Sequence, residues 1–290
     1  MRVLVTGCNG QVGHCLVQQL TGRVELLAVD RAELDITSQN DVEALVSEFN
    51  PDFIINAAAH TAVDKAEEEE AVSFAVNCDG PKFLAESAAR VGATLMHIST
   101  DYVFPGNKDG AYSEDDATGP LGVYGKSKLA GELAIAEKTD KFIILRTAWV
   151  FGEHGHNFVK TMLRLGKDRD ALNIVGDQYG GPTYAGDIAR ALISMMNQLP
   201  QEGDSSLYGI YHFSGAPHVS WCEFADVIFQ EAEQRGLLTA PKLTSITTDM
   251  YPTPAARPAN SKMDCTKIES AFNIKPSDWH LALKNINEYV

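Results

Sequence analysis

The sequence predicts an α/β protein: a doubly wound parallel sheet, with a smaller lobe built from C-terminal segments. Over the first 150 residues, short runs that are apolar throughout alternate with segments of helical spacing. This alternation is typical of parallel strands that are covered by helices on both faces. After Thr147 the alternation breaks, and the chain becomes rich in Gly, Pro, Asn and aromatic residues. We therefore expect the second lobe to begin near that point.

The predicted elements follow one another in a regular order. We expect strands at 3–6, 25–30, 53–56, 94–99 and 142–147, and helices at 12–20, 41–49, 71–91 and 124–137. Asn50-Pro51 ends the second helix, because a proline disfavours helical backbone at the residue before it. Gly80-Pro81 could offset the third helix. A later helix at 187–198 and a strand at 209–213 are expected to add to the sheet.

Composition and charge restrict the class of protein. The 290 residues are 44% hydrophobic and 22% charged, which is ordinary for a folded domain, and the net charge is −15. Such a charge opposes binding to nucleic acids or anionic membranes. The five cysteines form no C-x-x-C pair, so neither a zinc site nor a disulfide framework is expected. The first residues enter a strand directly, which leaves no room for a signal peptide. We expect a cytoplasmic protein that is a monomer or a homodimer.

A glycine-spaced turn follows the first predicted strand. Gly7, Gly10 and Gly13 stand between a strand and a helix, as in dinucleotide-binding proteins. Gly7 permits the tight turn, Gly10 lets the backbone approach a pyrophosphate, and Gly13 lets helix and strand pack closely. The sheet is therefore expected to be of the Rossmann type.

This motif sets the predicted domain division. Residues 1–150 are expected to form the dinucleotide-binding domain, to which 172–175 and 187–213 return. Residues 151–171 and 214–290 are expected to form the substrate-binding lobe.

Asp30 bears on the choice of cofactor. It ends the second strand at about the distance from Gly13 that is expected of a ribose-binding acid. Its carboxylate should bind the adenosine ribose and repel a 2′-phosphate. Arg31 follows, and it either pairs with that phosphate or is an ordinary surface arginine. We therefore expect the use of both NADH and NADPH.

Tyr124 and Lys128 lie four residues apart and thus on one face of a predicted helix. An ammonium group there would lower the pKa of the phenol, which could then donate a proton near neutral pH. Thr100, upstream, adds a hydroxyl group. Together with the glycine turn, these residues predict a hydride-transfer site. Tyr124 is the expected proton donor and Thr100 a second donor to the same oxygen, while Lys128 would hold the nicotinamide ribose.

Seven stretches carry a resemblance that covers nearly the whole chain. They are V-T-G-C-N-G-Q-V-G from Val5, N-A-A-A-H-T-A-V-D-K-A-E from Asn56, S-T-D-Y-V-F from Ser99, Y-G-K-S-K-L-A-G-E from Tyr124, R-T-A-W-V-F-G from Arg146, Q-Y-G-G-P-T from Gln178 and R-P-A-N-S from Arg257. With them the chain resembles the extended short-chain dehydrogenases/reductases, and more closely their dTDP-4-dehydrorhamnose reductase branch. The resemblance implies NAD(P)H-dependent reduction of the 4-keto group of dTDP-4-dehydro-L-rhamnose, a dTDP-linked 4-keto-6-deoxy sugar.

The resemblance also implies roles for individual residues. The catalytic set would be Thr100, Tyr124 and Lys128. The dinucleotide would contact Gly10, Gln11, Val12, Asp30, Ala59, His60 and Thr61. The sugar would contact Thr100, Asp101 and Trp149, and the diphosphate Asn157 and Arg257. Some relatives bind Mg²⁺ through glutamates at positions where this chain has Cys15 and Gly186, so we expect no metal and no dimer of that type.

Other interpretations stay open. An epimerase would share the Tyr/Lys pair but would retain its nicotinamide between turnovers. A regulatory subunit, similar to the beta subunit of methionine adenosyltransferase, would bind a dinucleotide without catalysis. His154 and His156 resemble metal ligands, but their spacing in a glycine-rich segment favours a substrate-side loop.

Overall fold

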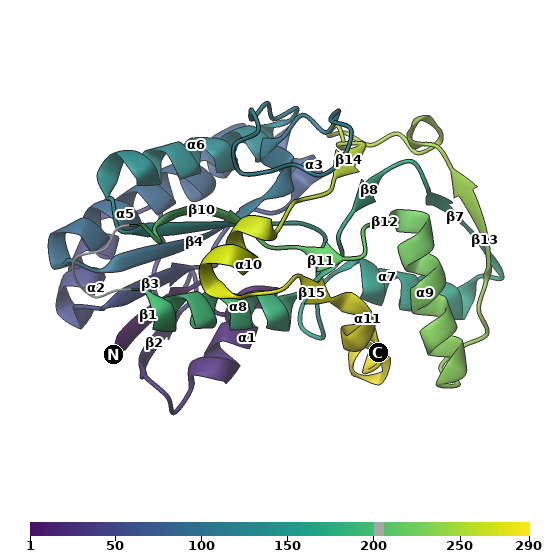
Figure 1. Cartoon of the computed structure of the whole chain (residues 1–290), viewed down its shortest axis with the longest axis horizontal. Coiled ribbons are helices and arrows are strands. Elements are labelled where there is room, and N and C mark those ends of the chain that lie inside the picture. Colours follow the sequence, from purple (N-terminus) through teal and green to yellow (C-terminus); the bar gives the residue numbers. More distant parts are fainter. Residues whose placement is uncertain (200–205) are drawn as a thin grey trace.

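A parallel sheet forms the centre of the larger lobe (Figure 1). The computed structural model describes residues 1–199 and 206–290, and within them the sheet has six strands in the order β10-β5-β4-β3-β1-β2. The strands are β1 (Arg2–Thr6), β2 (Glu25–Val29), β3 (Phe53–Asn56), β4 (Thr94–Thr100), β5 (Phe142–Thr147) and β10 (Gly209–His212). Every neighbouring pair is parallel. The order reverses between β1 and β3, and ligands of such sheets bind in the crevice at that point.

Helices cover both faces of this sheet, as its doubly apolar strands predict. In β1, Val3 and Val5 pack on one face and Leu4 on the other. The first face is covered by α1 (Gln11–Leu20) and α8 (Ala185–Gln198), and the second by α2 (Gln39–Phe49), α5 (Gly80–Val91) and α6 (Val123–Lys138). Figure 1 shows α8 and α1 below the sheet and α6 above it. The predicted doubly wound fold is confirmed.

The predicted helix 71–91 is divided at Gly80. It consists of α4 (Glu70–Phe74), a π turn at Ala75–Asp79 and α5. Pro81 stands in the first turn of α5, where its missing N–H costs no helical hydrogen bond. Such π turns frequently occur at functional sites. Here Asn77, inside the turn, bonds both backbone groups of His60 and the hydroxyl of Ser127 on α6.

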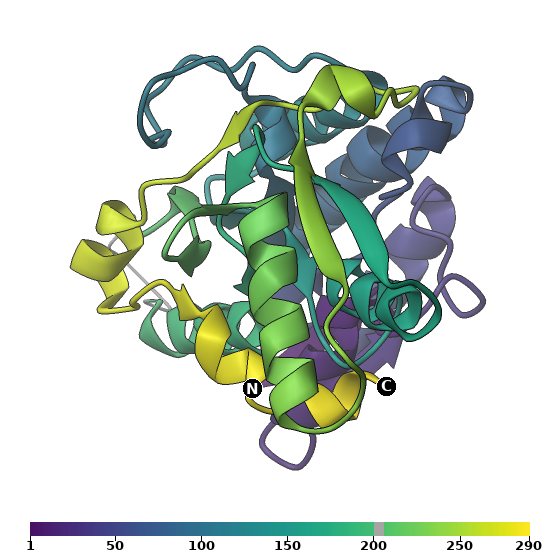
Figure 2. The ribbon, with the colours of Figure 1, turned by 90° about the vertical axis from the view of Figure 1, so that its right-hand side faces the viewer.

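The smaller lobe is a two-stranded ribbon backed by two helices. Strand β7 (Ala171–Val175) pairs in parallel with β13 (Lys242–Ile246), and α7 (Phe158–Asp168) and α9 (Trp221–Gln234) share its apolar cluster. Figure 2 shows α9 beside the paired strands. The prediction that 172–175 returns to the Rossmann sheet is therefore wrong. The strand alternates buried Leu172 and Ile174 with exposed residues, which suits a one-sided ribbon and not a sheet covered on both faces.

The segment after 214 serves both lobes. Helix α10 (Thr266–Phe272) places Ile268 and Phe272 in the same apolar cluster as α8, so this part of the predicted substrate lobe packs on the larger lobe. Helix α11 (Trp279–Leu283) packs in the smaller lobe. Short pairings join the remaining segments: β6 (Val150–Phe151) with β9 (Thr183–Tyr184), β8 (Tyr179–Gly180) with β12 (Val219–Ser220) and β14 (Asn260–Ser261), and β11 (Gly215–Ala216) with β15 (Ser277–Asp278). Residues 200–205 of the predicted returning segment 187–213 lie outside the described residues. Among the helices that the structure describes, none has the length and hydropathy to cross a bilayer.

Candidate active site

A cavity of about 500 Å³ opens at the carboxyl ends of β1, β3, β4 and β5. Its wall includes Gly10 after β1, Ala57 after β3, Thr100 at the end of β4 and Thr147 at the end of β5. Since parallel strands all end at this edge, residues far apart in the chain meet here. The helix α6 contributes Tyr124 and Lys128 to the same wall. The cavity thus joins the glycine turn to the predicted catalytic set.

The glycine turn has the geometry that its spacing predicts. Gly7 has a φ of +70°, and a Cβ there would lie 2.5 Å from the backbone nitrogen of Ala58. A Cβ on Gly13 would lie 2.1 Å from the carbonyl oxygen of Gly7, so helix α1 can approach the turn only without a side chain at that position. Gly10, Gln11 and Val12 line the cavity. Gly7 and Gly13 do not line the cavity, but they allow the tight turn and the close approach of α1.

Asp30 lies beside the turn and is bonded to Asn9, which lines the cavity. Its carboxylate accepts hydrogen bonds from the backbone N–H of Ala32 at 2.7 Å and from Asn9 Nδ2 at 2.5 Å. These bonds, chiefly the one from Ala32, lower the pKa of Asp30, which keeps it ionised. The side chain of Arg31 is 85% exposed and lies 3.8 Å from Asp35. Arg31 can therefore move toward a bound group or stay a surface arginine.

The segment after β3 contributes only part of its predicted contacts. Ala57, Ala59 and Thr61 line the cavity. The ring of His60 is instead held by Ser73 Oγ at 2.9 Å and by Glu69 at 3.4 Å. The His60 side chain thus does not line the cavity, and its contact with the cofactor stays a prediction.

Thr100 and Tyr124 bring two hydroxyl groups together in the cavity wall. Burial raises the pKa of Tyr124, and a hydrogen bond with Thr100 opposes that rise. Thr100 Oγ1 donates its hydrogen to Asp101 Oδ1 at 3.0 Å and accepts the backbone N–H of Tyr102. The two hydroxyl groups are therefore neighbours, and Thr100 has to turn its hydrogen away from Asp101 to act as the predicted second donor.

Lys128 does not act on Tyr124 as the sequence predicts. Its amine is almost fully buried, lies 2.7 Å from the carbonyl oxygen of Ile98 and 3.0 Å from His97 Nε2, and has its pKa lowered to about 8 by burial. The effects on the pKa of Tyr124 are dominated by desolvation, which raises it. The predicted lowering of the phenol pKa is wrong for this arrangement, because both groups are removed from water.

On the substrate side, Asp101 and Trp149 line the cavity as predicted. Burial raises the pKa of Asp101 to about 6. Trp149 has a φ of +49° and stacks on Trp221, with ring centroids 3.5 Å apart. Trp221 is half-buried and supports the cavity wall through this stack.

The two residues predicted to hold a diphosphate have other partners. Asn157 caps α7: its Oδ1 accepts the N–H of Lys160, and its Nδ2 donates to Gly152 and Gln11. Arg257 donates to Asp64 at 2.7 Å. Neither residue lines the cavity. Both polar atoms of Asn157 are already in use, whereas Arg257 keeps one terminal nitrogen without a partner among the described residues. The diphosphate contacts of Asn157 and Arg257 stay predictions.

The loop that contains His154 and His156 lies over the glycine turn. His154 stacks on His14 of α1, with centroids 4.2 Å apart, and contacts the carbonyl oxygen of Asn9 at 2.9 Å. His156 lines the cavity. The loop therefore meets both the glycine turn and the cavity, and its place on the substrate side stays a prediction. Among the described residues, no cluster of three or more His, Cys, Asp or Glu side chains could hold a metal ion.

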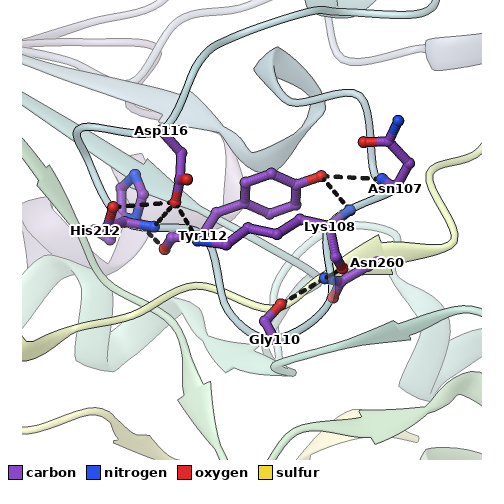
Figure 3. A network of polar contacts seen from close by, with 8 residues as sticks. Asn107, Lys108, Gly110, Tyr112, Asp116, His212 and Asn260 are labelled. Carbon is purple, nitrogen blue, oxygen red and sulfur yellow. Dashed lines mark hydrogen bonds and ion pairs between the residues drawn. The ribbon is translucent and has the colours of Figure 1, made fainter.

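A polar network holds the long loop between Thr100 and α6 (Figure 3). The Tyr112 hydroxyl accepts the backbone N–H groups of Asn107 and Lys108, both at 3.0 Å. Asn260 of β14 donates to the carbonyl groups of Lys108 and Gly110. These bonds tie the loop to the C-terminal segment, and the loop leads into the first turn of α6. The sequence analysis missed Tyr112 and Asn260, since nothing local marks such long-range pairs.

Sequence reasoning also missed His97. It is fully buried in β4 and contacts both Asn56 and Lys128. The signal was a histidine inside the otherwise apolar run Leu95-Met96-His97-Ile98, because a buried polar side chain needs hydrogen-bond partners.

Comparison with known proteins agrees with this geometry. The family model described as "RmlD substrate binding domain" matches residues 1–290. A dTDP-4-dehydrorhamnose reductase of Aggregatibacter actinomycetemcomitans is 53% identical, over 99% of both chains. The enzyme of that name from Escherichia coli K12 is 40% identical, over 99% of this chain and 97% of the relative.

Solved structures are similar over the same length. The dTDP-4-dehydrorhamnose reductase of Bacillus anthracis in complex with NADP has a TM-score of 0.91 at 36% identity, covering 100% of this chain and 99% of that one. A UDP-glucose 4-epimerase of Thermus thermophilus, in a complex with NAD, has a TM-score of 0.81 at 20% identity over 100% and 99%, and it shows the shared fold alone. The chain thus belongs to the RmlD substrate binding domain family, and the relatives compared at 36% identity or more carry the name dTDP-4-dehydrorhamnose reductase.

Proposed function

We propose that this protein reduces the 4-keto group of dTDP-4-dehydro-L-rhamnose to the alcohol, with NADPH or NADH as the reductant. The observation that carries the proposal is the convergence of Thr100, Tyr124 and Lys128 in one cavity with the glycine turn. The membership of the family and the names of its relatives support the choice of substrate. The larger lobe would hold the cofactor, and Trp149 with the smaller lobe would hold the sugar nucleotide.

The cavity suits a dinucleotide on observations of its own. A Cβ at Gly7 or Gly13 would fill the turn, and the start of α1 directs backbone N–H groups toward it. The hydroxyls of Ser99 and Thr147 are buried, without a hydrogen-bond partner among the described residues, and both residues line the cavity. Such groups are usually satisfied by something bound. When bound, the reduced nicotinamide supplies the hydride.

The remaining steps fall to side chains of this chain. Tyr124 gives its hydroxyl proton to the oxygen of the reduced carbonyl group, and Thr100 donates a hydrogen bond to the same oxygen. Two donors at the atom where charge develops stabilise the transition state more than the ketone. Lys128 lies on the cavity wall, where it would hold the nicotinamide ribose.

The test is a coupled assay. The 4-keto sugar is generated in situ, and the oxidation of NADPH and NADH is followed by absorbance, with a UDP-linked keto sugar as the control. Substrate-dependent oxidation with the dTDP sugar and a much slower rate with the UDP sugar are expected. Tightly bound NAD that turns over without net oxidation would indicate an epimerase instead. Stable association with a larger enzyme, without oxidation, would indicate a regulatory subunit.

Thr100→Val should lower kcat by about tenfold to 100-fold, because one donor to the developing oxyanion is removed. The Kd of the cofactor should change little, since the variant keeps the shape of the wall. Steady-state kinetics and fluorescence titration with NADPH measure the two quantities. An unchanged kcat in a folded variant would show that Thr100 has no part in the chemistry.

Asp30→Ala should lower kcat/KM for NADH by about tenfold or more, because a charge-assisted hydrogen bond to the ribose is lost. The efficiency with NADPH should fall less, since the same change removes a negative charge that would face the 2′-phosphate. The ratio of the two efficiencies is the measurement. Asp140→Ala, which removes an exposed acid after α6, is the control, and it should leave the ratio near that of the unmodified protein. A fall that is equal for both cofactors would contradict the role of Asp30.

A further inference from the structure

A chain of buried hydrogen bonds leads from the backbone after β3 to Lys128. Asn56 Oδ1 accepts the backbone N–H of Ala58 at 3.1 Å and the hydroxyl of Thr6 at 2.7 Å. Asn56 Nδ2 lies 2.9 Å from His97 Nδ1, and His97 Nε2 lies 3.0 Å from Lys128 Nζ. Asn56, His97 and Lys128 are each at most 1% exposed, so water does not compete for these contacts.

The backbone N–H at Ala58 fixes the direction of every bond in this chain. An amide N–H can only donate, so the carboxamide of Asn56 must turn its oxygen to Ala58 and its NH₂ group to His97. His97 Nδ1 therefore accepts, and in a neutral imidazole the hydrogen then sits on Nε2. That N–H is directed at the amine of Lys128. An ammonium group has no lone pair with which to accept it, whereas a neutral amine has one.

The charges around Lys128 do not reverse the preference for a neutral amine. Glu132, on the same helix, is bound at both oxygens by Arg146 of β5. Asp101, after β4, is itself buried and has its pKa raised. Tyr124 is neutral over the physiological range because burial raises its pKa. Burial lowers the pKa of Lys128 to about 8 in spite of Glu132, which raises it, and burial also lowers the pKa of His97, so both shifts are toward the neutral forms.

We propose that His97 is a positioning residue which, locked by Asn56 in its Nε2–H form, favours the neutral amine of Lys128. The consequence for the reaction rests on the proposed function. Lys128 lines the same cavity as Tyr124, so the protonation state of its amine would set an inflection in the pH profile of kcat.

The tautomer of His97 can be measured without any activity. Nitrogen-15 NMR of the full chain distinguishes protonated from unprotonated ring nitrogens, and the signals of one of the eight histidines are assigned by their loss in His97→Gln. We expect Nδ1 to be unprotonated and Nε2 to carry hydrogen, with a pH titration of these signals that reports Lys128. A hydrogen on Nδ1 would overturn the proposal, whether or not the protein is a reductase.

Asn56→Asp supplies the functional test. A carboxylate still accepts from Ala58 and Thr6, but it offers His97 an acceptor, so the ring hydrogen should move to Nδ1 and free Nε2 to accept from an ammonium. The midpoint of the Lys128 titration should rise by about one pH unit or more, and the matching inflection in the pH profile of kcat should rise with it. Thr6→Val, the matched control, removes only the other bond to Asn56, so it should change neither tautomer nor midpoint. A kcat profile that stays in place while the NMR midpoint moves would refute the effect of Lys128 protonation on the reaction.

Discussion

Replacing Tyr124 with phenylalanine is expected to lower kcat by about 100-fold to 10,000-fold, the range for the loss of a general acid. The change removes only the hydroxyl group that meets Thr100, and the ring keeps its place in the wall beside Val12 and Lys128. The Kd of NADPH should therefore stay within a few-fold of its original value. Single-turnover kinetics with the keto sugar, together with a cofactor titration, measure both quantities.

Tyr102→Phe is the matched control for this prediction. The two tyrosine rings meet edge to face, with centroids 5.4 Å apart, and both line the cavity. Tyr102 has its hydroxyl near Arg257 and not near Thr100. Loss of the Tyr102 hydroxyl group should lower kcat by less than about tenfold. If Tyr102→Phe were the more damaging of the two, the assignment of the proton donor to Tyr124 would be wrong.

The second large effect is expected from Glu132→Ala, which should lower the free energy of unfolding by about 3–5 kcal/mol. Arg146 binds both oxygens of Glu132, with its Nε 2.9 Å from Oε1, and the two side chains are 3% and 2% exposed. Without Glu132 the arginine of β5 would be a buried charge without its partner. The pair also joins α6, which carries Tyr124 and Lys128, to the sheet. Urea unfolding followed by circular dichroism measures the loss.

An exposed pair provides the comparison. Glu43→Ala removes the partner of Arg90 and should change the stability by less than about 1 kcal/mol, because water screens that exposed interaction. Glu132→Met combined with Arg146→Met should recover part of the loss, since no lone charge is left behind. A Glu132→Ala protein as stable as the original would show that Arg146 finds water or another partner in its place.

The parts of the fold that the sequence predicted are those that depend on local chemistry. The turn at Gly7 requires a positive φ, and the close approach at Gly13 allows no side chain, so the residue types themselves carry the information. The strands of the large sheet are apolar on both faces, and this pattern indicates that helices cover the sheet on both sides. Thr100 and Tyr124 could be placed because strand ends and helix faces are predictable from spacing.

The errors concern partners that only the folded chain brings together. Lys128 was expected to act on the phenol four residues away, but its amine is held by His97 and Ile98 of a neighbouring strand. Asn157 was expected to bind a phosphate, but its Oδ1 accepts the N–H of Lys160 at the start of α7. Strand β7 is apolar enough for the large sheet, and its actual partner, β13, lies far away in the chain. Side-chain spacing within one segment says nothing of these contacts.

The stacked pair of Trp149 and Trp221 gives the molecule a built-in optical reporter. Two of its three indoles lie face to face, one at the cavity wall and one on α9, so their electronic transitions are coupled. Any guest that displaces the Trp149 ring would break this coupling and alter both emission and ellipticity. Occupancy of the sugar pocket could thus be followed in real time without a label, even in variants that no longer turn over.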